Sequence, residues 1–84
     1  MTPRIVLLSR PGCGLCRTAR EVLERERART DFELEEVDIS TDLELERTYG
    51  IRIPVVLLDG EEFAEIEVDP KALRRAVRAR ARAG

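Results

Sequence analysis

The feature that most restricts the fold of this chain is a pair of cysteines, Cys13 and Cys16, at the start of a predicted helix. A short apolar and β-branched run over residues 4–9 precedes them and ends at the Pro-Gly turn of residues 11–12. Apolar residues then recur at helical spacing over residues 14–29. The chain is therefore predicted to pass from a buried strand into a helix directly through the cysteine pair.

Two further elements are predicted in the middle of the chain. Residues 33–39 alternate between apolar and acidic side chains, which indicates a strand near the edge of a sheet. Ser40, Thr41 and Asp42 offer N-caps for a short helix that is predicted to run to about residue 49. Thr41 and Glu44 have the spacing of a capping box, and Gly50 is expected to end the helix.

The C-terminal part predicts a hairpin followed by a helix. A buried strand is expected over residues 51–58 and its antiparallel partner over residues 62–67, with the Asp-Gly turn signal of residues 59–60 between them. Asp69 is the expected N-cap of the last helix and Pro70 its first residue. The side chains of this helix that are expected to face the core are Leu73, Ala76, Val77 and Ala81.

The predicted order of elements is β-α-β-α-β-β-α. The first β-α-β unit requires parallel strands joined by a right-handed crossover, and the hairpin adds two antiparallel strands. The expected fold class is thus α/β, with a four-stranded mixed sheet flanked by helices on both faces. The sequence shows no linker or repeat, so residues 1–84 are expected to form one domain.

The position of the two cysteines indicates their chemistry. The first turn of a helix has unsatisfied N–H groups and the positive end of the helix dipole, and both stabilise a thiolate. Cys13 is expected at the N-cap and exposed to solvent, and Cys16 is expected one turn later and more sheltered. Cys13 should therefore attack a disulfide, and Cys16 should resolve the mixed disulfide. Arg10 and Arg17 add positive charge beside the pair.

Two other uses of the cysteine pair are disfavoured by the sequence. Inert core cysteines are disfavoured because Gly14 and the Pro-Gly turn place the segment at the surface. Half of a zinc site is disfavoured because zinc prefers four ligands and the chain supplies two, so that a dimer would be needed. The chain has no histidine, which removes the usual metal ligand and the usual general base. No metal site is therefore expected.

Charge and hydropathy exclude several partners. The net charge is −2, so no overall basic field favours nucleic acid, and the Arg-rich C-terminal segment has no aromatic residue for base stacking. No apolar run approaches the roughly 20 residues that span a bilayer, and no signal peptide is recognisable. We therefore expect a cytoplasmic protein with neither a nucleic-acid nor a membrane partner.

The segment from Ser9 to Cys16, followed further on by Ile53 and Pro54, resembles glutaredoxins, and most closely the short bacterial glutaredoxin-like proteins of thioredoxin-like fold. The resemblance implies that Cys13 is the nucleophile and Cys16 the resolving thiol. It also implies that Pro54 occupies the family's cis-proline position. Local sequence alone favours a trans bond before Pro54, because only about 5–6% of X–Pro bonds are cis. Ile53 would then offer its backbone N–H and C=O to an extended substrate.

Two charged residues acquire expected roles from the same resemblance. Arg10 stands where many glutaredoxins carry a lysine that contacts the glutathione carboxylate or tunes the thiolate, and Asp69 lies in the region that binds the glutathione amine. Residues 14–15 are Gly-Leu where glutaredoxins usually have Pro-Tyr, so an aromatic wall of the glutathione site is missing. Leu7 stands where thioredoxins have a buried aspartate, so no buried carboxylate base is expected.

The predicted function is thiol–disulfide oxidoreduction by a dithiol mechanism in a monomer. No tightly bound cofactor is expected, and glutathione is the candidate co-substrate. The expected substrates are protein or low-molecular-weight disulfides, with glutathione or thioredoxin reductase as electron donor. Two alternatives stay open. One is a dimeric iron–sulfur carrier that uses Cys13 and glutathione as ligands, and the other is an arsenate-reductase-like enzyme that uses Cys13 and Arg17.

Overall fold

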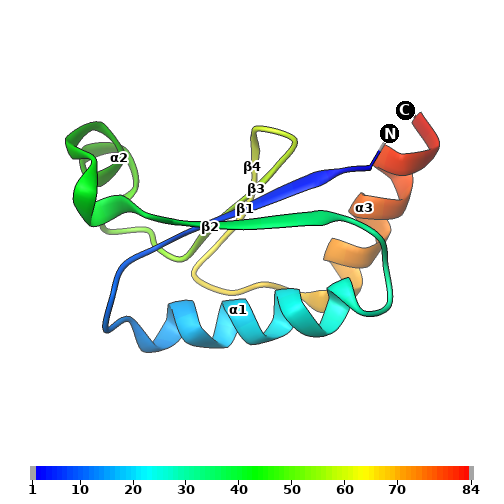
Figure 1. The fold of residues 1–84 in the computed structure, drawn as a ribbon, viewed down its shortest axis with the longest axis horizontal. Helices are drawn as coiled ribbons and strands as arrows, with labels where there is room; N and C mark the ends of the chain where they lie inside the picture. The colour runs from blue at the N-terminus through cyan, green and yellow to red at the C-terminus, as the bar shows by residue number, and fades with distance from the viewer. Residues whose placement is uncertain (1, 84) are drawn as a thin grey trace.

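A four-stranded sheet lies at the centre of the structure, a computed structural model that describes residues 2–83 (Figure 1). Its strand order is β2-β1-β3-β4, in which β1 is parallel to β2 and antiparallel to β3, and β3 is antiparallel to β4. This arrangement confirms the predicted fold class, including the edge position of β2. In chain order the elements are β1 (Arg4–Ser9), α1 (Gly14–Arg27), β2 (Glu33–Asp38), the 3₁₀ turn η1 (Ile39–Thr41), α2 (Leu43–Tyr49), β3 (Val55–Leu58), β4 (Glu61–Glu65) and α3 (Pro70–Ala83).

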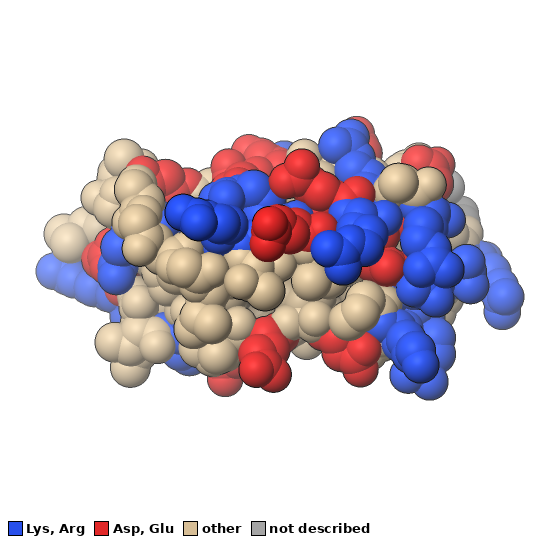
Figure 2. All heavy atoms as spheres, turned by 90° about the horizontal axis from the view of Figure 1, so that it is seen from below, with Lys and Arg blue, Asp and Glu red and all other residues tan. Residues whose placement is uncertain are grey.

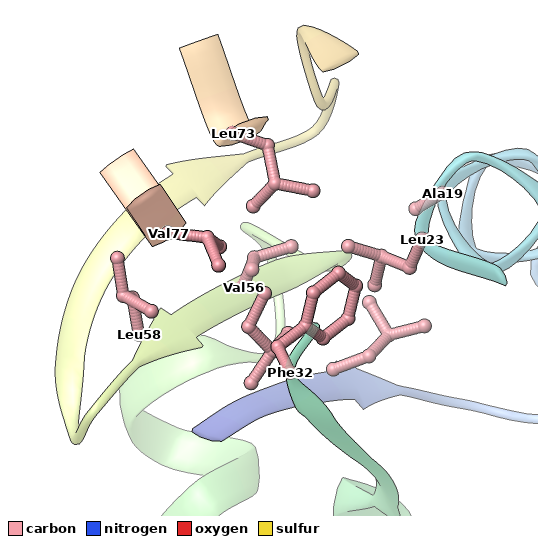
Figure 3. Packing of buried hydrophobic residues seen from close by; sticks show 9 residues of the cluster. Ala19, Leu23, Phe32, Val56, Leu58, Leu73 and Val77 are labelled. Atoms are coloured by element: carbon pink, nitrogen blue, oxygen red, sulfur yellow. The ribbon is translucent and has the colours of Figure 1, made fainter. Parts of the chain in front are cut away.

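The helices cover both faces of the sheet because successive strand side chains point to opposite sides. In β1, Leu7 packs beneath α1 and α3, whereas Leu8 packs on the other face with Val55, beside Leu45 of α2. Figure 3 shows the larger cluster, in which side chains from α1 and α3 meet over the sheet. Its buried members are Ile5, Leu7, Ala19, Leu23, Phe32, Val56, Leu58, Leu73 and Val77.

The central and C-terminal elements differ from expectation at several points, and β4 spans Glu61–Glu65 instead of residues 62–67. β3 begins at Val55, not at residue 51, because Pro54 has no N–H for the strand ladder. Helix α2 is capped by Asp42, whose carboxylate accepts the N–H groups of Glu44 at 2.9 Å and Leu45 at 3.2 Å. Asp42 is one of the three caps that the sequence offers, and Thr41, which has the capping-box spacing to Glu44, lies in η1. In α3, Ala81 is exposed, not directed at the core.

The predicted hairpin turn and the start of α3 are confirmed. Asp59 and Gly60 both have positive φ, 50° and 87°, as a tight turn between β3 and β4 requires. Asp69 caps α3, because its carboxylate accepts the N–H of Lys71 at 3.0 Å, and Pro70 is the first helical residue. None of the helices described between residues 2 and 83 is long and apolar enough to cross a lipid bilayer.

Candidate active site

Cys13 is the N-cap of α1, as predicted. Its backbone is extended, with φ −90° and ψ 112°, and its N–H donates to the carbonyl of Arg10 at 3.3 Å. Its side-chain sulfur accepts the N–H of Cys16 at 3.2 Å. The first turn of α1, all of it within the described chain, contains no acidic residue, so no carboxylate there opposes the positive end of the helix. Cys13 is a partly exposed residue, and its sulfur lies where a negative charge is stabilised.

Cys16 lies one turn further along α1 and has no exposed surface. Burial, followed by the hydrogen bond with Cys13, raises the pKa of Cys16 to about 11. Cys16 is consequently a neutral thiol at neutral pH, whereas Cys13 faces solvent. Both cysteines are free thiols in this structure, which represents the reduced form. The difference in exposure is the one predicted for an attacking and a resolving thiol.

Pro54 follows a cis peptide bond with Ile53. The cis bond agrees with the glutaredoxin resemblance, and the local-sequence expectation of a trans bond is wrong. Val55 pairs with Leu8, so Pro54 lies at the end of the sheet where β1 leads into the cysteine turn. Within the described chain, neither the N–H nor the C=O of Ile53 forms a hydrogen bond with another backbone group. The backbone of Ile53 is thus available at this edge.

The two charged residues expected at the substrate site both have partners within the protein. The guanidinium of Arg10 forms an ion pair with the carboxylate of Glu46 on α2. Asp69 uses one carboxylate oxygen to cap α3 through the N–H of Lys71. About a third of the Arg10 and Glu46 side chains is exposed, at 38% and 35%, so an incoming carboxylate can still reach this pair. Contact of Arg10 and Asp69 with a substrate stays a prediction.

Sequence reasoning missed a carboxylate near Cys16. Glu36 of β2 accepts the Ser9 hydroxyl at 2.7 Å and Nε of Arg20 at 2.5 Å. The hydrogen bond from Arg20 is the main reason why the pKa of Glu36 is below its usual value. The negative charge of Glu36 is one of the causes that raise the pKa of Cys16. In sequence Glu36 looks like one more acid of an edge strand. Its parallel pairing with Leu7 brings it into the site.

Among the residues described, no group of three or more histidine, cysteine, aspartate or glutamate side chains is gathered as a metal site. A metal ion or cluster bound by the cysteine pair would therefore need further ligands from outside the described residues. The arrangement built here is suited to thiol chemistry: an accessible sulfur at a helix start, a buried thiol behind it, and an unpaired backbone segment beside both.

Comparison with known proteins agrees with this arrangement. Residues 4–78 match the family described as Glutaredoxin-like domain (DUF836). An uncharacterized protein of Mycobacterium tuberculosis is 35% identical over 77 residues, which cover 86% of this chain and 79% of that protein. A solution structure from Nitrosomonas europaea has a TM-score of 0.81 and 25% identity and covers 92% of this chain and 93% of its own. A mutant thioredoxin from Halobacterium salinarum has a TM-score of 0.68 and 26% identity, with 92% and 73% covered.

Proposed function

Because this chain belongs to the Glutaredoxin-like domain family (DUF836), we propose that it is a thiol–disulfide oxidoreductase in which Cys13 attacks and Cys16 resolves. The observation that carries this proposal is the hydrogen bond of 3.2 Å from the Cys16 N–H to the Cys13 sulfur at the start of α1. A helix start stabilises the thiolate, which is the attacking form of cysteine. The buried Cys16 thiol stays protonated and does not compete for the substrate.

The reaction has two exchange steps. In the first, the Cys13 thiolate forms a bond with one sulfur of the substrate disulfide. The S–S bond breaks, and the other substrate sulfur leaves with the electron pair and takes up a proton from water. In the second, the sulfur of Cys16 attacks the Cys13 sulfur, the bond between Cys13 and the substrate breaks, and the proton of Cys16 passes to the substrate sulfur that leaves as a thiol. The protein's dithiol has then lost two electrons, and the substrate disulfide has gained them.

The backbone beside Cys13 supplies the positioning. An extended substrate can pair with the free N–H and C=O of Ile53 as an added strand, which would bring its disulfide to the end of the sheet. Arg10 and Asp69 remain our proposed contacts for charged groups of a substrate or of glutathione. Residues from one chain are enough for the whole dithiol cycle, so we propose that the protein acts as a monomer.

The oxidised protein must be returned to the dithiol form. We propose that a thiol donor does this, either glutathione or thioredoxin reductase, without a tightly bound cofactor. This requirement suits a reducing compartment such as the cytoplasm, where thiol donors keep cysteines reduced. Both protein disulfides and low-molecular-weight disulfides are compatible with an accessible Cys13.

A redox titration in glutathione buffers tests the proposal. We expect a two-electron equilibrium between the dithiol and the Cys13–Cys16 disulfide, with glutathione attached to Cys13 in mass spectra of the intermediates. Two cysteines that oxidise independently of each other would contradict the proposal. A coloured dimer after anaerobic purification would instead support the iron–sulfur alternative.

A further inference from the structure

Large apolar side chains are exposed near the proposed catalytic cysteine. Leu15, between the two cysteines, is 52% exposed, and Ile66, whose N–H donates to the Pro54 carbonyl at 2.7 Å, is 40% exposed. Among the described residues, the other large apolar side chains that are exposed are those of Ile51 and Leu43. Exposed apolar residues that gather at one place indicate a contact surface for a partner.

Two of these side chains line a groove of about 220 Å³ between α1 and the segment that joins β4 to α3. Figure 2, seen from the side on which α1 lies in Figure 1, shows a broad uncharged band of surface bordered by charged side chains. The one charged residue among those described along the groove is Glu67. The apolar side chains of the groove are Leu15, Ala19, Val22, Ile66 and Val68.

The backbone at Ile66 has an unusual conformation that favours a role for this side chain. Its φ is 68°, in the left-handed region that β-branched residues rarely adopt. Glycine or asparagine would take this φ with less strain. Backbone strain of this kind gathers at functional sites. The hydrogen bond to Pro54 ties the strained residue to the candidate active site, so the isoleucine side chain is held at the groove beside the cysteines.

The chemistry of the groove distinguishes between two kinds of substrate. Glutathione is a small anion with two carboxylates, and the described lining residues offer it a carboxylate, Glu67, and no cation. A protein disulfide lies in a polypeptide whose side chains continue past the cysteine. A groove of this size and apolar lining suits one large aliphatic or aromatic side chain. Leu15, which lines the groove, lies two residues after Cys13 in the first turn of α1, so one end of the groove lies close to the reacting sulfur along the helix.

We propose that this groove binds an apolar side chain that neighbours the reactive cysteine of a protein substrate, so that the enzyme selects polypeptide disulfides by an apolar neighbour. The proposal rests on the proposed thiol–disulfide function. It names the substrate class of that site: an extended polypeptide that pairs with the Ile53 backbone and places a leucine-like side chain between α1 and Ile66. Burial of such a side chain is worth about a tenfold preference over a polar one.

The test uses two disulfide peptides that are identical except for leucine or serine beside the cysteine. We expect wild-type kcat/KM to be about tenfold higher for the leucine peptide. In the Ile66→Asn variant, the ratio of kcat/KM for the leucine peptide to kcat/KM for the serine peptide should fall to about one. Asparagine tolerates the positive φ, so urea unfolding should show no loss of stability. Val22→Thr keeps the shape of the opposite wall, adds a hydroxyl, and should also lower the ratio. The control is Leu43→Asn, which changes an exposed apolar residue outside the groove and should leave the preference for the leucine peptide unchanged.

The outcomes separate the two proposals. A wild-type protein that reduces hydroxyethyl disulfide but treats both peptides alike overturns the groove and leaves the oxidoreductase function standing. A protein that reduces no disulfide contradicts the proposed function. The groove is then judged by NMR titration with the same peptides carrying serine in place of cysteine. Shifts of the Ala19 and Val22 amides with the leucine peptide alone would support it, and no selective shift would overturn it.

Discussion

The backbone N–H of Cys16 donates to the sulfur of Cys13 across 3.2 Å, although the two residues differ sharply in exposure. A single helical turn therefore gives the two thiols opposite properties. The first is accessible and lies at the positive end of α1, and the second is completely buried within the same helix. The order of attack and resolution follows from this asymmetry.

Replacement of each cysteine separately should give different results. Cys13→Ser should abolish disulfide reduction, because the serine hydroxyl is not ionised at neutral pH. Cys16→Ser should keep partial, glutathione-dependent activity and accumulate a mixed disulfide on Cys13, because nothing displaces the substrate. Activity assays and intact-mass spectra check both outcomes. Equal activity in the Cys13 variant and the wild type would remove Cys13 from the mechanism.

The reduced protein should lose stability at alkaline pH through Cys16. Its pKa is raised from 9.0 to about 11, first by burial, so the unfolded chain releases this proton before the folded one does. The contribution is fully present below about pH 9 and is lost as the pH rises through about 11. It amounts to on the order of 3 kcal/mol. Urea unfolding of the wild type and of Cys16→Ala at several pH values isolates it. Parallel stability curves for the two proteins would refute the prediction.

Glu36 should tune the ionisation of Cys16. Its carboxylate raises the pKa of Cys16 and also neutralises Arg20, one turn further along α1. Glu36→Gln keeps an acceptor for Ser9 but removes the negative charge, so the pKa of Cys16 should fall. Thiolate absorbance measured in a Cys13→Ser background reports Cys16 alone. The matched control is Glu33→Gln, at the other end of the same strand. The prediction fails if the two substitutions shift the titration equally.

The contact between α1 and α3 should depend on one ion pair. Glu26 is 2% exposed, and its carboxylate accepts Nε of Arg74 at 2.8 Å, with a second contact at 3.2 Å. A double-mutant cycle with Glu26→Gln and Arg74→Gln should show a larger coupling than the same cycle at the exposed pair Arg80–Glu61, because solvent screens the latter. Urea unfolding supplies the free energies.

Acid should weaken the same pair. The hydrogen bond from Arg74 holds the pKa of Glu26 below its usual value. The stability that the carboxylate contributes is present above its unfolded pKa, about 4.5, and is lost as the pH falls through the folded pKa. Glu26→Gln should flatten this part of the stability curve. If the coupling equals that of the exposed pair, or the acid limb is unchanged in the variant, then Glu26 and Arg74 do not join the helices energetically.

Local features were the most predictable part of this chain. The Asp-Gly turn of residues 59–60 and the Asp-Pro start of α3 were confirmed, because each depends on the conformational preferences of adjacent residues. The capping of α2 shows the limit of such patterns. Thr41 and Asp42 are both good caps, and the choice fell to Asp42 because η1 holds Thr41 within its own turn.

The sequence by itself determined the order of strands and helices and the place of Cys13 at the start of α1, because periodicity, caps and turns are interactions between near neighbours. Only the tertiary structure decided the cis bond before Pro54, the pairing of Arg10 with Glu46, and the groove at Ile66. The ion pair and the groove join residues that are far apart in the chain, and the cis bond is set by the fold around the buried Pro54. The residue pattern within one strand or helix does not show which distant element it will pack against.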